Sequence, residues 1–276
     1  MRNLVTLFLV LAGLLSILVT CHTSALAAGA TTELHIVKYA ADGTTVLDEK
    51  TVSYQWMEEN LPVYGDGVTH YYHQGPVFEG DMWDPSETQN LKDKGAMMGT
   101  STRDLCDLVG GMSPRDIVRF VAGDGWHTEF AYENVYEPMG RQGPIVLGWF
   151  NEAEPESGEK YGTGYPGLEG YHSAMQIVLM AGTTNDAGQY VFGNEDMRVA
   201  LPQEEYQHFY QGFPSTNGLS GKWITHLIIY SEDEPPSTAA LTQSASEEPK
   251  PGVAEAKTES SSSASKSAGL LTPILW

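Results

Sequence analysis

Short apolar runs separated by glycine, proline and Asp-Gly turns are the feature that most limits how this chain can fold. Between residues 31 and 231 most runs have roughly the four to eight residues of a β-strand, which is too short for most helices. No glycine-rich phosphate loop opens a helix in the sequence. We therefore expect an α+β, mainly-β domain with short helices rather than a doubly wound α/β fold.

Two pairs of runs predict β-hairpins. The run TELHIVKYA is followed by ADGTTV, which contains an Asp-Gly turn signal, and then by the polar run VLDEKTVSY. In RDIVRFVAGDGWHTEFAY, residues 123–125 form a Gly-Asp-Gly turn between two alternating runs. The continuous apolar run MQIVLMAG predicts a buried strand, and further strands are expected at QYVFG, MRVALP and GKWITHLIIYS.

Two short helices are expected from their capping residues. In SYQWMEENLP, Ser53 has the position of an N-cap, and Pro62 ends the helix. In STRDLCDLVGGM, Ser101 and Asp104 have the spacing of a capping box, and the glycines at 110–111 close the helix. Cys106 lies inside this second helix, where we expect it to be a small buried apolar side chain.

The first 27 residues predict export. Arg2 precedes the apolar run LVTLFLVLAGLLSILV, and Ala25-Leu26-Ala27 forms a small-residue cleavage site. Residues 1–27 are therefore interpreted as a signal peptide, with a lipidated Cys21 as the alternative, and a secreted or cell-surface location follows. Cleavage after Ala27 would leave Cys106 as the only thiol, so an intramolecular disulfide could not form.

The charge of the chain limits its partners. The formal net charge is −21, and no run of lysines and arginines is present to displace the counterions of a duplex. Nucleic acid is therefore excluded as an expected partner. The partners that remain are a small ligand or cofactor, and a membrane or cell wall that holds the chain through its tail or through a lipidated Cys21.

The composition changes at about Glu232, beyond which large apolar side chains nearly disappear until Leu270. Residues 232–276 cannot bury enough apolar surface to offset their chain entropy, so we expect a disordered stalk. The final segment LLTPILW is too short to span a bilayer, which takes about 20 apolar residues.

Removal of this stalk is expected to leave the domain folded. Limited proteolysis should cut beyond about Glu232 first. The trimmed domain should keep the thermal unfolding midpoint of the full chain, and a lower midpoint would show that the boundary is wrong.

Three blocks, in this order along the chain, resemble the oxidoreductase molybdopterin-binding domain of the sulfite oxidase type. The block STRDLCDLVGGMSPRDIVRFVAGDGWHTEF resembles the family's RDLL helix, glycine, strand and DGY turn. DMRVALPQEEY resembles its LRLVVP segment, and GLSGKWITHLIIY resembles its terminal KWL strand. Upstream, YQWMEENLPV resembles the helix that ends in LP. The resemblance implies a sulfite-oxidase-like fold over residues 31–231 and a site for a molybdopterin cofactor.

The chain departs from this family at the metal ligand. In the family, a cysteine thiolate between the LP pair and a following tryptophan ligates molybdenum. Here the interval from Pro62 to Trp83 contains no cysteine, and its segment GDGVTHYYHQGPVFEGDMWDP offers His70 and His73 instead. Imidazole suits divalent zinc, copper, iron or nickel, so these histidines are candidate ligands for a metal or a cofactor. We expect residues 65–85 to form the rim of the site.

Other residues complete the candidate site. His127 and His172 lie in glycine-rich and aromatic-rich connections and are candidate metal ligands together with His70 and His73. Hydrogen bonding of these histidines to loop backbone is the alternative. By the resemblance, Arg198 and Lys222 lie where basic side chains hold the pterin's phosphate and oxygens. Aromatic residues expected to line a pocket, or else to fill the core, are Tyr71, Tyr72, Phe78, Trp83, Trp126, Tyr161, Tyr165 and Tyr171.

From these features we expect an exported or cell-surface protein that binds a small ligand, cofactor or metal at a degenerate molybdopterin-type site. One alternative is a molybdopterin-dependent oxidoreductase with a ligand other than cysteine. A second alternative is a structural cell-surface module that has the fold and no site. The sequence leaves the identity of the cofactor open between molybdopterin and a divalent transition metal.

Overall fold

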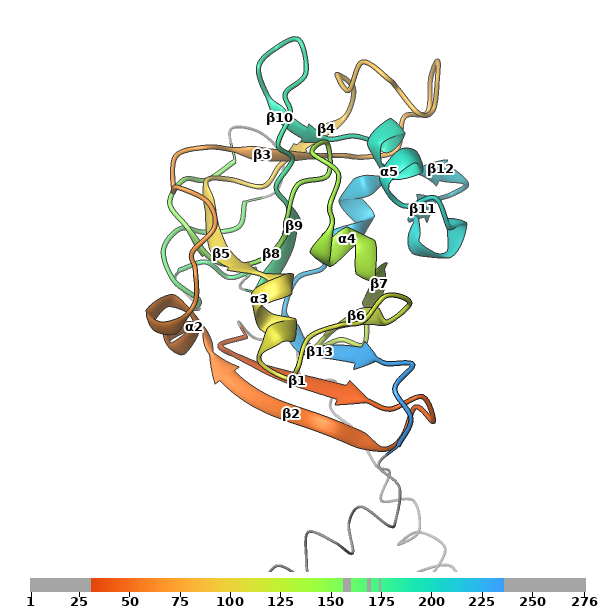
Figure 1. Cartoon of the computed structure of the whole chain (residues 1–276). Helices are drawn as coiled ribbons and strands as arrows, with labels where there is room; N and C mark the ends of the chain where they lie inside the picture. The colour runs from red at the N-terminus through yellow and green to blue at the C-terminus, as the bar shows by residue number, and fades with distance from the viewer. Residues whose placement is uncertain (1–30, 156–159, 168–169, 174, 236–276) are drawn as a thin grey trace, which may run out of the picture. The chain divides into compact units, whose positions relative to one another are not determined.

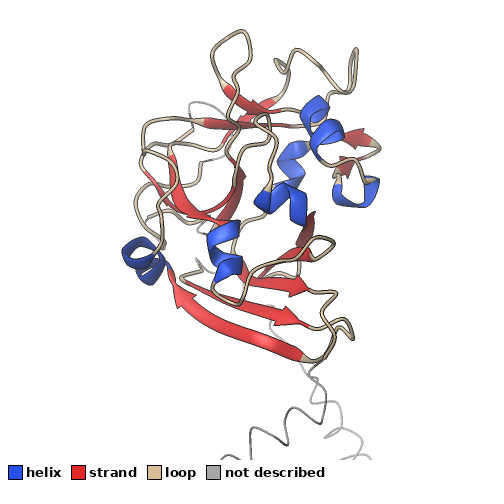
Figure 2. Cartoon of the chain, in the orientation of Figure 1, coloured by secondary structure: helices blue, strands red, loops and turns tan. Residues whose placement is uncertain are grey.

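The computed structural model describes residues 31–155, 160–167, 170–173 and 175–235. The predicted signal peptide at 1–27 and nearly all of the predicted stalk at 232–276 lie outside these residues. The described part is mostly β-sheet with a few short helices, in agreement with the α+β class expected from the sequence (Figure 2). None of its helices is long and apolar enough to cross a membrane.

A five-stranded sheet joins the two ends of the domain (Figure 1). Both predicted hairpins are confirmed in it, because β1 pairs antiparallel with β2 and β6 pairs antiparallel with β7. The last strand, β13, lies parallel to β1 and antiparallel to β6. The strands, in their order across the sheet, are β2 (Val46–Ser53), β1 (Glu33–Tyr39), β13 (Ile224–Tyr230), β6 (Ile117–Ala122) and β7 (His127–Ala131).

Three smaller sheets complete the domain. All four residues of β9 are buried, which confirms the strand predicted at MQIVLMAG. The strands are β5 (Met97–Ser101), β8 (Ile145–Asn151) and β9 (Gln176–Leu179) in one sheet, β10 (Tyr190–Phe192), β3 (Tyr71–Gln74) and β4 (Leu91–Asp93) in the next, and β11 (Phe209–Tyr210) with β12 (Phe213–Pro214) in the last.

Both predicted helices are present with their predicted caps. In α2 (Tyr54–Asn60) the hydroxyl of Ser53 accepts a hydrogen bond from the Trp56 N–H at 3.2 Å. In α3 (Thr102–Asp107) Ser101 accepts from the Asp104 N–H at 3.1 Å and donates to the Asp104 carboxylate at 2.6 Å. The other helices are α4 (Tyr132–Tyr136), α5 (Asn194–Ala200) and the single 3-10 turns η1 (Glu204–Tyr206) and η2 (Thr216–Leu219).

The strand predicted at MRVALP is wrong, because this segment lies in α5. Gly193 begins the helix, and its N–H donates to the carboxylate of Asp196 in the first turn. Met197, Ala200 and Leu201 are buried at the three- and four-residue spacing of one helical face. A segment this short fits both the helical and the strand spacing of apolar residues. The acidic residues in its first turn favour the helix.

The main core lies between the five-stranded sheet, α3 and the β5–β8–β9 sheet. Trp149 is its largest fully buried side chain, and the indole N–H donates to the Thr100 hydroxyl at 3.0 Å. Cys106 is also fully buried, which confirms its expected role as a core residue. Burial raises the pKa of the Cys106 thiol well above its ordinary value, so this sulfur is not a reactive thiolate.

Candidate functional site

The segment 65–85, predicted as the rim of a site, is partly built into a sheet. Its residues 71–74 form β3, the central strand between β10 and β4. The preceding turn is closed by Asp66, whose carboxylate accepts from the N–H groups of Val68 and Thr69 at 2.9 and 2.6 Å. Asp66 thus has the structural role of a turn residue. The loop between β3 and β4 carries the rest of the segment.

His70 and His73 point to different partners. His70 is partly buried, and its Nδ1 lies 2.8 Å from the Asp93 carboxylate. His73 is fully buried, and its Nε2 accepts from the Leu179 N–H at 3.1 Å. Burial, and then the nearby Lys94 ammonium, lower the pKa of His73 well below its ordinary value, so it is a neutral core imidazole.

The four histidines predicted as metal ligands are not assembled into one site. His127 and His172 are both exposed, His127 at the first position of β7 and His172 in the connection before β9. Among the residues that the structure describes, no group of three or more His, Cys, Asp or Glu side chains is arranged to hold a metal ion. These residues therefore do not fit a molybdenum centre, which in the resembling family also requires a thiolate.

Arg198 and Lys222 are both engaged with neighbouring side chains. Arg198 lies on α5, where it pairs with Glu195 and its guanidinium lies 4.8 Å from the centre of the Trp83 ring. The ammonium of Lys222 lies 4.7 Å from the centre of the Tyr161 ring. Lys222 lines a hollow that Arg198 does not line, so the two cations do not meet in that hollow.

Two of the aromatic residues considered for a pocket fill the core, which was the alternative stated from the sequence. Tyr161 and Tyr171 are buried in a second apolar cluster around Met97 and Val178. Trp126 is partly buried and lines the same hollow as Lys222. The aromatic-rich composition of this chain thus serves packing at some positions and a concave surface at others.

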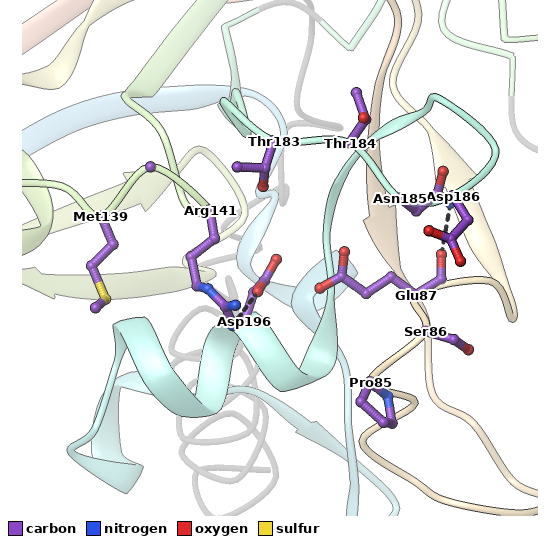
Figure 3. A pocket seen from close by; sticks show the side chains of 11 residues that line it. Pro85, Ser86, Glu87, Met139, Arg141, Thr183, Thr184, Asn185, Asp186 and Asp196 are labelled. Atoms are coloured by element: carbon purple, nitrogen blue, oxygen red, sulfur yellow. Dashed lines mark hydrogen bonds and ion pairs between the residues drawn. The ribbon is translucent and has the colours of Figure 1, made fainter.

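A polar cavity lies beside the loop that follows β3, directly after the predicted rim (Figure 3). Its volume is about 500 Å³, within the range of small-molecule sites. It is lined by residues 85–87 of that loop, 139–141 after α4 and 183–186 before β10, together with Asp196 of α5.

A buried hydrogen-bond network holds this loop against α5. The Gln74 amide donates to the Asp84 carboxylate at 2.6 Å and to the Gln89 carbonyl at 2.9 Å. Its oxygen accepts from the Asn194 N–H, the first residue of α5, at 2.8 Å. Burial opposes ionisation of Asp84, yet hydrogen bonds from Ser86, Gln74 and the Thr88 and Gln89 amides lower the pKa of Asp84. The loop therefore folds around the charged Asp84 carboxylate, which accepts these hydrogen bonds.

Glu87 occupies a strained backbone position in this loop. Its φ is +54°, in the left-handed region that costs a non-glycine residue about 1–3 kcal/mol. Asn185, in the loop before β10, donates from its side chain to the Glu87 carbonyl at 2.9 Å and so fixes the main chain there. Strain of this kind is retained where the side chain has to face a particular direction, and that of Glu87 faces the cavity (Figure 3).

The carboxyl groups of Glu87 and Asp196 both line this cavity and influence each other, because Asp196 raises the pKa of Glu87 and Glu87 lowers that of Asp196. Asp196 is 2% exposed, and its Oδ1 lies 2.7 Å from the guanidinium of Arg141. The chain at Arg141 is fixed by its neighbour Gln142, which is buried. The Gln142 side chain accepts from the Asn134 side-chain amide and donates to the Asn134 carbonyl, both at 2.8 Å. We call Glu87, Asp196 and Arg141 the carboxyl-pair site.

This arrangement keeps one proton on the pair at neutral pH. Burial, then the hydrogen bond to Asp196 and the charge of Asp196, raise the pKa of Glu87 to about 8. Burial also raises the pKa of Asp196, while the proton donated by Glu87 and the charge of Arg141 act against that rise. The raised pKa of Glu87 favours one proton on the pair at neutral pH, as expected for adjacent carboxyls that cannot both ionise.

None of the three residues of the carboxyl-pair site was predicted from the sequence. Glu87 lies only two residues beyond the predicted rim, in DPSETQN, where the Asp-Pro-Ser turn signal is visible but the direction of Glu87 is not. Asp196 directly precedes MRVALP, where a strand was predicted in place of the helix that carries it. Arg141 comes from a different part of the chain, and no local pattern links it to the other two.

Comparisons with known proteins assign no family to the chain. No protein-family model matches the sequence, and no curated protein matches it significantly. The functional argument therefore depends on the site itself.

Proposed function

We propose that this is an exported binding protein that binds a small, positively charged organic ligand, such as an amine, in the cavity of the carboxyl-pair site. Its domain is proposed to be a sulfite-oxidase-like fold that no longer binds molybdenum. Export is supported by the signal-peptide pattern at residues 1–27, and the fold by the order of the resembling blocks along the chain.

The observation that carries this proposal is the position of the Glu87 carboxyl in the cavity beside the buried Asp196–Arg141 ion pair, where the pKa of Glu87 is raised to about 8. The one guanidinium that lines the cavity is already paired, whereas Glu87 and the exposed Asp186 remain as acceptors. An anion would meet the Asp186 carboxylate and a guanidinium that is already paired, while an ammonium group would meet carboxyl acceptors and could displace the Glu87 proton. The net charge of −21 further raises the concentration of cations near the surface.

Binding of an amine at pH 7 is expected to release about one proton per ligand, because Glu87 ionises when the ammonium group replaces its proton. Calorimetric titration with putrescine or agmatine, in two buffers of different ionisation enthalpy, measures this release. The Glu87→Gln variant keeps the shape and the hydrogen bond but cannot ionise, so its Kd should rise about tenfold.

The control is Glu33→Gln, which removes an exposed carboxylate at the start of β1, and it should leave Kd unchanged. Equal affinity for amines in the Glu87→Gln variant would contradict the proposal. Binding of citrate in preference to amines would contradict it as well.

The two alternatives from the sequence give different results in elemental analysis of natively purified protein. Stoichiometric molybdenum or tungsten would establish the oxidoreductase alternative and would overturn the proposed loss of metal binding. Absence of both amine binding and metal would leave the structural module as the better description.

A further inference from the structure

Two adjoining hollows form a groove that shares no lining residue with the cavity of the carboxyl-pair site. The first has a volume of about 260 Å³ and is lined by Asp124, Trp126, His208 and residues from 217 to 223. The second, of about 150 Å³, is lined by residues 127–129 and 205–207. Trp126, His208 and Gly218 line both, so the hollows are continuous, and we call them together the Trp126 groove.

The rings of Trp126 and His208, which line the Trp126 groove, pack directly against glycines. A Cβ on Gly221 would lie 1.9 Å from the Trp126 ring, and a Cβ on Gly218 would lie 1.9 Å from the His208 ring. Any other residue at either position would displace the ring. The walls of the groove are therefore set by close packing of aromatic rings on backbone.

A second indole, that of Trp223, is held at the same groove. Its N–H donates to the His172 carbonyl at 2.9 Å, and its backbone has a φ of +55°, which is unusual for a bulky residue. Trp223 has this energetically costly backbone conformation, is partly exposed and lines the first hollow together with Trp126.

Polar groups with unused hydrogen-bonding capacity surround these rings. One oxygen of Asp124 accepts from the Trp126 N–H at 3.0 Å, and the other accepts from no residue in the described part of the chain. The Asn217 oxygen accepts from the Lys94 ammonium at 2.7 Å, which leaves its amide hydrogens as donors toward a ligand. Glu205 and Gln207 add further acceptors and donors in the second hollow.

We propose that the Trp126 groove binds a short neutral saccharide, with one sugar ring against the indoles of Trp126 and Trp223. A pyranose ring has a face of C–H groups that packs on an aromatic ring and a rim of hydroxyls that both donate and accept. Both requirements are met here by named groups, since the rings supply the apolar face and Asp124, Asn217 and Glu205 supply the polar rim. The two connected hollows provide room for two sugar units.

Other ligand classes match these groups less well. A flat aromatic ligand would use the indoles but would make no hydrogen bonds to the carboxylates of Asp124 and Glu205. An anionic ligand would meet the two carboxylates of Asp124 and Glu205 against the single ammonium of Lys222, which already lies 4.7 Å from the centre of the Tyr161 ring, in a protein whose net charge is −21. A neutral polyol with a rigid ring is therefore the class that satisfies the lining.

The test is titration of the full chain with cellobiose, maltose, lactose and chitobiose, followed by tryptophan fluorescence and by saturation-transfer NMR. At least one disaccharide should bind saturably and show transfer to its C–H face. The Trp223→Asn variant should weaken this binding about tenfold, and asparagine tolerates the left-handed backbone, so the variant should remain folded. Asp124→Asn keeps the turn acceptor and should also weaken binding.

Trp56→Leu is the matched control, because Trp56 is a partly exposed indole on α2 that does not line the groove. It should leave the affinity for the sugar unchanged. No saturable binding by any of the four disaccharides would overturn the proposal, as would equal affinity in Trp223→Asn. Tight binding of a free pterin such as neopterin in the same groove would overturn it too, and would favour the cofactor class implied by the sequence resemblance.

Discussion

Between pH 5 and pH 8 the free energy of unfolding of the wild type is expected to fall. In the Glu87→Gln variant it should fall much less over the same range. The pKa of Glu87 is raised from 4.5 to about 8 in the folded protein, first by burial and then by Asp196. Between these two values the folded chain holds a proton that the unfolded chain has released. Stability therefore decreases as pH rises through this window, and the loss is complete above pH 8.

The expected size of this effect is about 1–3 kcal/mol, reduced from the full linkage value because the Glu87 side chain is only partly shielded from solvent. Urea unfolding of the wild type and of Glu87→Gln at pH 5, 7 and 9 measures it as a difference that grows with pH. Glutamine donates to Asp196 as the protonated acid does, so the variant should be the more stable protein at pH 9. A constant difference across the range, or the same slope in the Glu33→Gln control and in Glu87→Gln, would refute the shared proton.

Gln74→Met is expected to lower the free energy of unfolding by about 3–5 kcal/mol, although methionine has nearly the same volume. Gln74 is fully buried, and its amide makes three hydrogen bonds, to Asp84, Gln89 and the Asn194 N–H. The substitution removes all three and leaves the buried Asp84 carboxylate with fewer donors. Chemical denaturation at pH 7 measures the loss.

The same variant should loosen the loop from residue 76 to residue 90, because Gln74 ties that loop to the start of α5. Limited proteolysis should then cut within this loop, and the Glu87–Asp196 contact should be lost with it. Gln203→Met is the control, since Gln203 is exposed and makes no capping bond, and its effect should stay within about 0.5 kcal/mol. Unaltered protease resistance in Gln74→Met would show that the loop is held by other contacts.

Most of the secondary structure could be predicted because its signals are local. The hairpins β1–β2 and β6–β7 follow from Asp-Gly and Gly-Asp-Gly turns that require left-handed backbone, and α2 and α3 follow from serine caps next to the chain they cap. The exception is α5. Its apolar residues fit either period, and the decisive hydrogen bond from Gly193 to Asp196 competes with a strand pattern of similar strength.

The candidate site could be predicted only in its neighbourhood. The sequence indicated that residues 65–85 border a site, and the carboxyl-pair cavity begins at Pro85. The two histidines of that segment do not line this cavity, since His73 accepts from the Leu179 N–H and the Nδ1 of His70 lies against the Asp93 carboxylate. Which side of a strand faces the core depends on its neighbours in the sheet, and β10 is more than a hundred residues away in the chain.

By itself, then, the sequence determined the α+β class, the hairpins, the capped helices and the acidic character of the surface, because each depends on residues that are close together in the chain. Only the tertiary structure decided which side chains meet. Glu87, Arg141 and Asp196 come from three separate segments, and the pKa of Glu87 is raised only because folding removes its carboxyl from water and brings it close to Asp196. Burial and distance are properties of the packed chain, and no local pattern of residues encodes them.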